Sequence, residues 1–404
     1  MRVLHTSDWH LGQHFMGKTR QFEHQQFCRW LIEQVQAHQV DALIIAGDIF
    51  DTGAPPSYAR EQYNRFIVEL RNTGCELVVL GGNHDSVAML GESKTLLEQL
   101  DTRVIPGVCE DISEQLLVLN QRDGSPGALL CGIPFIRPRE VLQSQAGQSA
   151  AEKQLSLQQA IAGHYQALFD LAQVKKAELG GNLPIIATGH LTTVGASASE
   201  SVREIYVGAL EAFPTNAFPP VDYIALGHIH RPQKVAGLEH IRYCGSPIAL
   251  SFDEARQQKE VLLVELDANG LQQVTVLPVP RVQPLLSLRG SLKELQPAIT
   301  EAAKQGTDAQ PVWLEVQVST DDYLSDLQTR IAAMCEGLPV EVLRIRRERG
   351  AATASLFSDS KETLDELSPE QVFAQRLSSE SLDASEQLRL AALYRQTLEQ
   401  LQGE

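Results

Sequence analysis

Residues 41–51 read DALIIAGDIFD: an unbroken apolar run ends in a glycine and is followed at once by a carboxylate, Asp48. An apolar run of this length is typical of a strand that is buried on both faces. Runs of the same kind recur along the first 280 residues, as RVLHTS, CELVVLGG, ALLCGIPF, LPIIATGH, DYIALGH and VLLVEL. The stretch therefore predicts one of several buried strands.

Longer helical patterns lie between several of these runs. One extends from about Thr19 to His38, and another begins after Pro55-Pro56. A third is expected near residues 155–180, after a polar loop. The alternation of strands and helices predicts an α/β domain with a largely buried sheet.

The composition changes after this domain, in a segment with three prolines: Pro278, Pro280 and Pro284. Prolines at this spacing suggest a linker. A β-α-β-α-β pattern follows, then a polar tether, then helical patterns in which Ser368 and Gln371 form a capping-box arrangement. The terminal helices either pack on their own chain or dock on a partner. The expected regions are 1–280, 281–350, 351–366 and 367–404.

Composition excludes several classes of protein. The chain of 404 residues has 34 Lys and Arg against 51 Asp and Glu, a net charge of −17, which argues against broad electrostatic binding to nucleic acid. Any nucleic-acid function must then use a local patch, metal ions or a basic partner. The six cysteines are scattered, which favours a reduced, cytoplasmic protein. We expect no signal peptide and no membrane span, since no apolar run approaches roughly 18 residues.

Polar residues that suit metal binding follow five of the predicted strands. In chain order they are Asp8, His10, Asp48, Asp51, Asn83, His84, Asp85, His190, His228 and His230. Because ligands bind at the carboxyl ends of strands in α/β sheets, we expect these side chains to meet at one edge of the sheet. Imidazole, carboxylate and amide ligands suit Mn²⁺, Fe²⁺ or Zn²⁺ in a two-metal hydrolytic site, with Asp48 placed centrally as a bridge.

Each motif alone has an ordinary explanation. GNHD by itself is typical of a turn. GHIH by itself fits polar residues of a loop, or core histidines whose hydrogen bonds are satisfied. Their joint occurrence, each after a strand, favours the metal site. Six other histidines lack this context and are interpreted as ordinary: His5, His14, His24, His38, His164 and His240.

DWH, GDIFD, GNHD, GH and GHIH, in this order, resemble the motifs of the calcineurin-like metallophosphoesterases. Longer stretches, such as HTSDWHLG, AGDIFDTGAPPSYAR and YCGSPIALSFDE, are similar to the nuclease subunits of bacterial DNA-repair complexes within that superfamily. The resemblance spans nearly the whole chain. It implies a β-sandwich flanked by helices, a small α/β capping domain and C-terminal helices.

The resemblance also implies roles for single residues. One ion would be held by Asp8, His10 and His230, and the other by Asn83, His190 and His228, with Asp48 as the bridge. His84 would face the scissile phosphate without binding metal, and Asp51 would orient His84. The sequence itself offers one dense basic cluster, Arg344, Arg346, Arg347 and Arg349, for which contact with DNA phosphates and a solvated strand edge are comparable explanations.

The activity that this resemblance implies is a Mn²⁺-dependent DNA nuclease with two ions per chain, acting on duplex ends, hairpins and blocked ends in repair, recombination and replication. Its partner would be an SMC-like ATPase, in a heterotetramer, since the chain itself has no GxxxxGK[ST] loop. A homodimer would form through helices near 56–71 and 87–100, although Tyr63, Phe66 and Leu70 fit an ordinary core as well. The rivals are a phosphodiesterase for small molecules or phosphoproteins, and a non-catalytic scaffold.

Overall fold

The computed structural model describes residues 1–142, 150–206, 210, 212–319, 326–347, 389–390 and 393–394. These residues divide into two compact units. The first consists of Met1–Ser287 and Gln305–Leu314, and the second of Leu288–Lys304 and the chain that begins at Glu315. The predicted tether and terminal helices at 351–404 fall almost entirely outside the described residues, and the expectations about them stay predictions.

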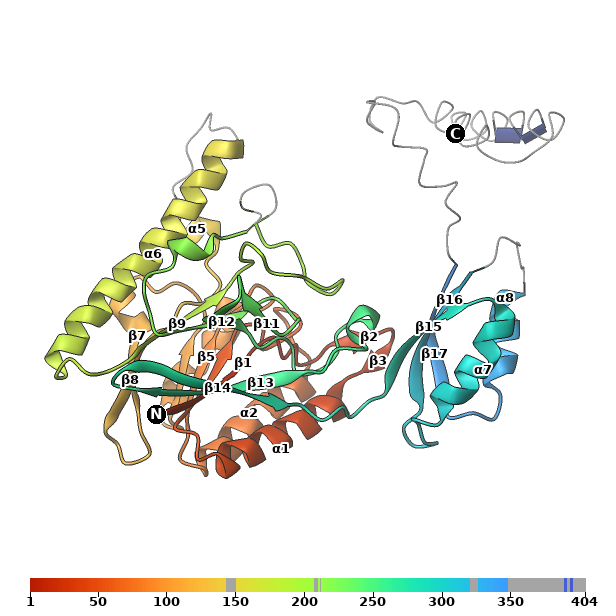
Figure 1. Ribbon diagram of the computed structural model, residues 1–404, viewed down its shortest axis with the longest axis horizontal. Coiled ribbons are helices and arrows are strands. Elements are labelled where there is room, and N and C mark those ends of the chain that lie inside the picture. Colours follow the sequence, from red (N-terminus) through yellow and green to blue (C-terminus); the bar gives the residue numbers. More distant parts are fainter. Residues whose placement is uncertain are drawn as a thin grey trace. The chain divides into compact units, whose positions relative to one another are not determined.

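Two six-stranded sheets form the centre of the first unit (Figure 1). The first sheet has the order β14-β13-β1-β4-β5-β6, with bounds Gly270–Pro278, Glu260–Asp267, Arg2–Thr6, Ala42–Ala46, Glu76–Leu80 and Thr102–Ile105. The second has the order β11-β12-β10-β9-β8-β7, with bounds Gln233–Val235, Leu238–Tyr243, Tyr223–Gly227, Ile185–His190, Pro126–Cys131 and Leu116–Asn120. The strands that carry the predicted ligands run parallel within each sheet: β1, β4 and β5 in one, β9 and β10 in the other.

Alternate residues of each central strand enter different cores, which explains the unbroken apolar runs. In β4, Ala42 and Ile44 pack between the two sheets, whereas Leu43 and Ile45 pack on the outer face of the first sheet. Because both faces are covered, all five residues of β4 are buried and apolar. The expectation of one sheet was therefore incomplete. Two sheets supply the strand ends, and the β-sandwich expected from the resemblance is confirmed.

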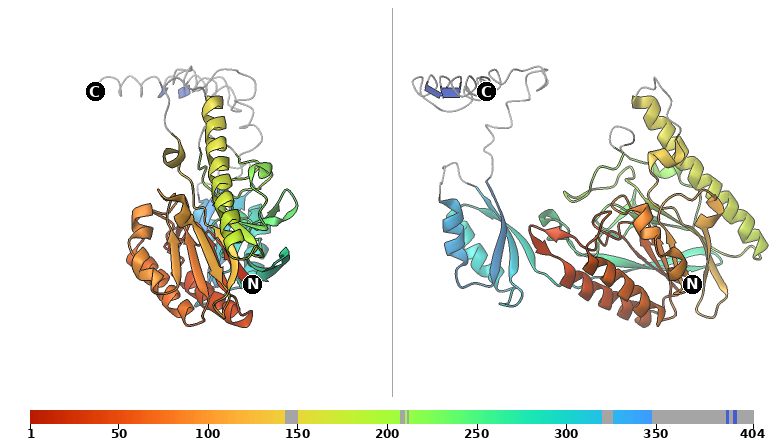
Figure 2. Two further views of the ribbon diagram at one scale, coloured as in Figure 1. Left: turned by 90° about the vertical axis from the view of Figure 1, so that its left-hand side faces the viewer. Right: turned by 180° about the vertical axis from the view of Figure 1, so that it is seen from behind.

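Helices cover the outer faces of both sheets, giving layers that can be followed in Figure 2. The first sheet is covered by α1 (Gln21–Ala37) and α2 (Ser57–Arg71), close to their predicted positions, and the second by α6 (Ala150–Glu178). Tyr63, Phe66 and Leu70 of α2 are buried in the first core, as expected of ordinary core residues.

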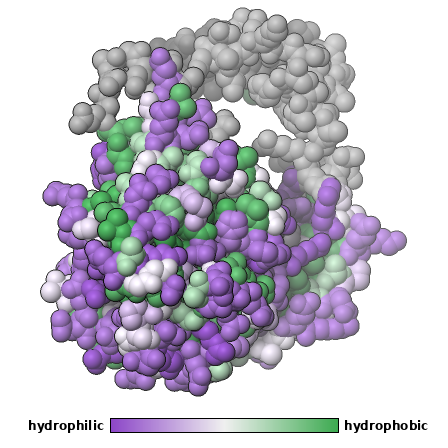
Figure 3. Space-filling view, turned by 60° about the vertical axis from the view of Figure 1, so that its left-hand side comes forward, coloured by the Kyte–Doolittle hydropathy of each residue, from purple (hydrophilic) through white to green (hydrophobic). Residues whose placement is uncertain are grey.

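Short elements complete the first unit. The helices are α3 (Val87–Gly91), α4 (Lys94–Glu98) and α5 (Pro138–Val141), and the 3-10 turns are η1 (Ile112–Gln115), η2 (Thr215–Ala217) and η3 (Phe252–Glu254). A small hairpin is formed by β2 (His14–Phe15) and β3 (Lys18–Thr19). The face drawn in Figure 3 is largely hydrophilic, with smaller hydrophobic patches, as expected for a chain with so many carboxylates. Among the described helices, none is long and apolar enough to cross a membrane.

The predicted β-α-β-α-β pattern forms a three-stranded sheet with two helices. The strands are β15 (Leu285–Gly290), β16 (Val312–Val318) and β17 (Val340–Arg347), in that order across the sheet. The helices are α7 (Leu292–Ala303), which begins with a capping box of Ser291 and Glu294, and α8 (Leu327–Cys335). In the sheet, Arg344 Nε donates to the buried Glu315 carboxylate at 2.5 Å, and Arg346 Nε lies 3.3 Å from it. Two arginines of the basic cluster thus already have a carboxylate partner.

Candidate metal centre

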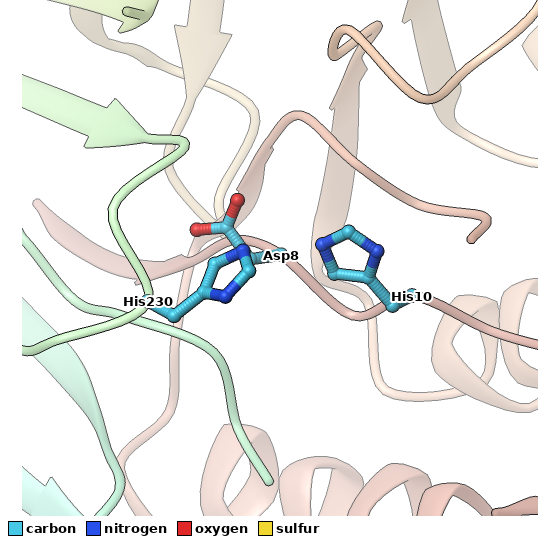
Figure 4. Close-up of side chains that lie close together, drawn as sticks. All are labelled: Asp8, His10 and His230. Atoms are coloured by element: carbon cyan, nitrogen blue, oxygen red, sulfur yellow. The ribbon is translucent and has the colours of Figure 1, made fainter. Parts of the chain in front are cut away.

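Seven carboxylate and imidazole side chains from five loops meet above the carboxyl ends of β1, β4, β5, β9 and β10. They form three overlapping groups whose ligand atoms all lie within 4.8 Å of one another: Asp8, His10 and His230; His10, Asp48 and His84; and Asp48, His190 and His228. Figure 4 shows the first group, with the His230 ring beside the Asp8 carboxylate and the His10 ring close by. The structure thus brings together side chains that are far apart in the sequence, such as Asp8 and His230.

The backbone around these side chains is held in an uncommon conformation. Asp8, His10, Asp48 and His228 have φ angles of 55°, 48°, 50° and 91°, in the left-handed region that residues other than glycine rarely adopt. The loops hold one another in place, since Asp8 N–H donates to Gly47 O and His10 N–H to Asp48 O, both at 3.0 Å. Backbone strain of this kind is concentrated at functional sites.

Two glycines allow the loops to approach this closely. A Cβ on Gly82 would lie 2.1 Å from Asp48 Oδ1, and a Cβ on Gly227 would lie 1.9 Å from Ala46 O. Any side chain at these positions would push apart the loops of β4 and β5, or of β4 and β10. The glycines before the metal motifs are therefore required by packing.

Hydrogen bonds at Nδ1 fix the orientation of two imidazoles. His190 Nδ1 donates to Ala46 O at 2.9 Å, so Nε2 is the ring atom turned toward Asp48 and lies 3.2 Å from Asp48 Oδ2. His10 Nδ1 lies 3.1 Å from Asp51 Oδ1, and its Nε2 lies 3.6 Å from the same Asp48 oxygen. Asp48 Oδ2 therefore stands between two imidazole nitrogens, the position that a bridging ligand requires.

Among the described residues that form the three groups, two buried ring nitrogens lack any hydrogen-bond partner: Nε2 of His10 and Nε2 of His228. A buried polar atom without a partner is costly, and a metal ion would satisfy both. The amide oxygen of Asn83 lies beside two of these imidazoles, 2.9 Å from His190 Nε2 and 3.1 Å from His228 Nδ1. The donor set of nitrogen and oxygen atoms fits divalent ions such as Mn²⁺, Fe²⁺ or Zn²⁺.

The Asp48–His190 pair shows how strongly this site attracts positive charge. Burial alone would raise the pKa of Asp48 and lower that of His190, but their mutual attraction prevails. The pKa of Asp48 falls well below its usual range, and the pKa of His190 rises to about 9. A proton thus occupies the pair in the metal-free protein, and binding of a cation requires its release.

The expected contact between Asp51 and His84 exists, but through a different atom. His84 Nδ1 donates to the backbone carbonyl of Asp51 at 2.7 Å, whereas the Asp51 carboxylate contacts His10. The loop turns the Asp51 carboxylate toward His10, so Asp51 contacts His84 through its backbone alone, and an effect of Asp51 on His84 stays a prediction. The His84 side chain is partly exposed, and its Nε2 takes no part in the hydrogen bond that Nδ1 makes to the Asp51 carbonyl.

Asp85 has a structural function that its position after the third strand did not reveal. The buried carboxylate accepts hydrogen bonds from the backbone N–H groups of Ile49, Phe50 and Gly82, at 2.8–3.1 Å. It therefore joins the loop after β4 to the loop after β5. Arg137 supports the second loop from outside, since its Nη2 donates to Asp85 O at 2.9 Å and to Gly82 O at 3.3 Å. Sequence reasoning did not find Arg137.

A second buried carboxylate, Glu254, lies behind His230. Lys259 Nζ donates to Glu254 Oε2 at 2.6 Å and to the backbone carbonyl of His230 at 2.9 Å. Burial alone would raise the pKa of Glu254, but His230 and Lys259 together hold it well below its usual range. Glu254 is therefore ionised. Its only sequence signal was its place at the end of YCGSPIALSFDE.

The chain is similar to several known proteins. Residues 1–232 match the family model described as calcineurin-like phosphoesterase, and residues 281–381 match the model described as type 5 capsule protein repressor C-terminal domain. The chain is 53% identical over 404 residues, covering 100% of itself and 99% of the relative, to the SbcD subunit of the nuclease SbcCD from Escherichia coli (strain K12). It is 32% identical to the protein of the same name in Rhodobacter capsulatus, covering 93% of this chain and 94% of that one. A solved dimetal phosphatase from Danio rerio is 11% identical and covers 69% of this chain and 98% of its own, with a TM-score of 0.38.

Proposed function

Since the chain belongs to the calcineurin-like phosphoesterases and, within them, to the SbcD nuclease subunits, we propose that it is a metal-dependent DNA nuclease that hydrolyses phosphodiester bonds. The observation that carries the proposal is the position of Asp48 Oδ2 between the Nε2 atoms of His10 and His190. Identity of 53% to a nuclease subunit over all 404 residues favours DNA over small phosphodiesters or phosphoproteins as the substrate. The complete ligand set likewise disfavours a non-catalytic scaffold.

Two divalent ions, Mn²⁺ in our proposal, would occupy the centre. Asp8, His10 and His230 would hold one, Asn83, His190 and His228 would hold the other, and Asp48 would bridge them. When bound, the ions would stabilise charge on the scissile phosphate and lower the pKa of the attacking water. Orphaned Nε2 atoms on His10 and His228 support this assignment, one for each ion.

His84 would act on the phosphate without binding metal. Because its Nδ1–H is committed to the Asp51 carbonyl, Nε2 is the ring atom left to face a substrate. A proton on Nε2 would stabilise charge on the phosphate or pass to the leaving oxygen. His84 also lies within 4.8 Å of the His10 and Asp48 ligand atoms, so metal analysis of a variant must test this role.

The substrates would be duplex ends, hairpins and blocked ends, in repair, recombination and replication within the cytoplasm. The partner would be the SbcC-type SMC-like ATPase, in a heterotetramer built on a homodimer of this chain, with residues 367–404 as the docking element. The name of the relatives, which makes them subunits of the nuclease SbcCD, supports such a complex. Arg344 and Arg346 both contact the Glu315 carboxylate. Any contact that they make with DNA would therefore be made while they are paired with Glu315.

A cleavage assay tests the activity directly. Hairpin-capped duplex DNA is incubated with Mn²⁺, with and without the ATPase partner, beside bis(p-nitrophenyl) phosphate as a generic diester. We expect cleavage of the DNA, its loss on chelation, and its loss in Asp48→Asn. Turnover of the generic diester with no cleavage of DNA under any condition would support the small-molecule alternative instead.

Truncation tests the docking element. Removing the chain from Lys361 onward is expected to leave the melting behaviour of the rest of the protein little changed and to abolish co-purification with the ATPase. A large fall in melting temperature would show instead that the terminal segment packs on its own chain.

A further inference from the structure

The imidazole of His230 is connected to a buried carboxylate through a single hydroxyl group. Ser201 Oγ lies 2.6 Å from His230 Nδ1 and also contacts Glu254 Oε1. The direct distance from His230 Nδ1 to that oxygen is 3.5 Å, too long for a good hydrogen bond. Ser201 comes from the loop between β9 and β10, and Glu254 from η3, so three separate segments of the chain meet at this hydroxyl.

The carboxylate at the end of this chain of contacts is held firmly. Glu254 is fully buried and accepts hydrogen bonds from Lys259 Nζ at 2.6 Å and from the Leu250 N–H at 3.0 Å, both at Oε2. Its other oxygen, Oε1, is left for the serine hydroxyls. An ionised carboxylate can only accept hydrogen bonds, so every group around Glu254 must donate to it.

This rule fixes the direction of each hydrogen bond. The Ser201 hydroxyl must donate its one proton to Glu254 Oε1. Its oxygen can then only accept from His230, which places the His230 proton on Nδ1 and the lone pair on Nε2. The Nε2 atom is therefore the one available to the group of Asp8, His10 and His230.

We propose that Ser201 and Glu254 are positioning residues for the metal centre, which hold His230 in the tautomer and orientation that present Nε2 to the ion. The proposal rests on the proposed function, because it assumes that Asp8, His10 and His230 bind a divalent cation. Residues that orient a ligating histidine in this way commonly change metal affinity by about 10–100-fold when they are removed.

The same loop provides a matched control. Ser199 Oγ also donates to Glu254 Oε1, at 2.7 Å, and lies 3.1 Å from Ser201 Oγ. No hydrogen bond between Ser199 and His230 is found among the described contacts. Removing either hydroxyl takes one donor from Glu254, but only the removal of Ser201 breaks the connection to His230.

The experiment compares Ser201→Ala, Ser199→Ala and Ser201→Thr in the full-length chain, freed of metal with a chelator and titrated with Mn²⁺ in a calorimeter without DNA. We expect Ser201→Ala to weaken one class of site by about 10–100-fold. Ser199→Ala should stay within about twofold of the unchanged protein, and Ser201→Thr, which keeps a hydroxyl, should restore most of the affinity. Nitrogen-15 NMR of the metal-free protein should show the His230 proton on Nδ1, and a mixture of tautomers in Ser201→Ala.

Each other outcome has a defined meaning. Wild-type affinity in Ser201→Ala, with an unchanged tautomer, would overturn the proposal. Equal losses in Ser201→Ala and Ser199→Ala would also overturn it, since docking of the loop and not the bond to His230 would then matter. Absence of Mn²⁺ binding in the unchanged protein would instead refute the metal centre itself, and the NMR result would still decide whether Ser201 sets the tautomer.

Discussion

The carboxylate of Asp51 lies 3.1 Å from Nδ1 of His10, on the side of the ring opposite the atom that faces Asp48. This contact makes the Asp51 side chain a support for a proposed metal ligand, His10, whereas the resemblance implied a support for His84. Because its backbone carbonyl holds His84, the two functions of Asp51 can be separated by changing the side chain alone.

We expect Asp51→Ala to weaken binding of one Mn²⁺ by about 10–100-fold, since His10 would lose the acceptor that orients it. Asp51→Asn, which keeps an oxygen for His10 Nδ1, should lose much less. Calorimetric titration of the metal-free proteins measures both affinities. An Asp51→Ala protein that binds both ions as tightly as the unchanged protein would show that His10 needs no such support.

His84→Ala should bind Mn²⁺ nearly normally and lose cleavage by a factor of about 10²–10⁴, the usual contribution of a general acid. The physical reason is that His84 Nδ1 is already committed to the Asp51 carbonyl, and its remaining nitrogen faces a partly open space. Metal content by elemental analysis and cleavage of hairpin-capped DNA give the two readouts. Loss of one equivalent of metal in this variant would make His84 a ligand.

Much of this candidate site could be predicted from the sequence because its proposed ligands follow strands. The runs before Asp48 and His190 are almost entirely apolar, which marked them as doubly buried strands, and the residues after such strands gather at the sheet edge. The existence of a second sheet was not visible in these runs, because a buried strand looks the same in either sheet. Only the resemblance to known phosphoesterases indicated the sandwich.

The supporting residues were beyond prediction for a different reason. Arg137, Ser201 and Glu254 lie outside the strands, far in sequence from the metal-site residues that they contact, and no spacing rule links them to those residues. Glu254 is 24 residues from His230, and Arg137 is 52 residues from Asp85. Their functions follow from tertiary contacts alone.

The burial of His24 should lower the free energy of unfolding as the pH falls below about 6.5. Burial lowers the pKa of His24 to about 3, and its Nε2 lies 2.7 Å from the Trp9 carbonyl, in a fully enclosed place. Since the unfolded chain takes up this proton near pH 6.5 and the folded chain does not, the contribution to stability is complete above pH 6.5 and is lost progressively as the pH falls toward 3.

The test compares chemical unfolding of the unchanged protein and of His24→Gln at several values between pH 7.5 and pH 4.5. Below pH 6.5, the free energy of unfolding of the unchanged protein should fall more steeply, by up to about 1.4 kcal/mol per pH unit. His14→Gln, at an exposed position, is the matched control and should leave the slope unchanged. Equal slopes in His24→Gln and the unchanged protein would show that His24 takes up its proton in the folded state.

Two glycine-to-alanine substitutions should change the free energy of unfolding in opposite directions. A Cβ on Gly82 would lie 2.1 Å from Asp48 Oδ1 and 2.2 Å from Asp48 N, and neither loop can yield without moving the proposed bridging ligand. We expect Gly82→Ala to lower the free energy of unfolding by about 1–3 kcal/mol, as overpacking does, and to reduce Mn²⁺ binding. In contrast, Gly163 is exposed within α6, and a Cβ there meets nothing within 4 Å.

Gly163→Ala should therefore raise the free energy of unfolding by about 0.5–1 kcal/mol, because alanine loses less backbone entropy in a helix, and should leave Mn²⁺ binding unchanged. Chemical unfolding and calorimetric titration of the two variants measure both effects side by side. If Gly82→Ala keeps full stability and both ions, the loop after β5 must be able to move away from Asp48, and the tight packing of these two loops would not be what fixes the bridging carboxylate.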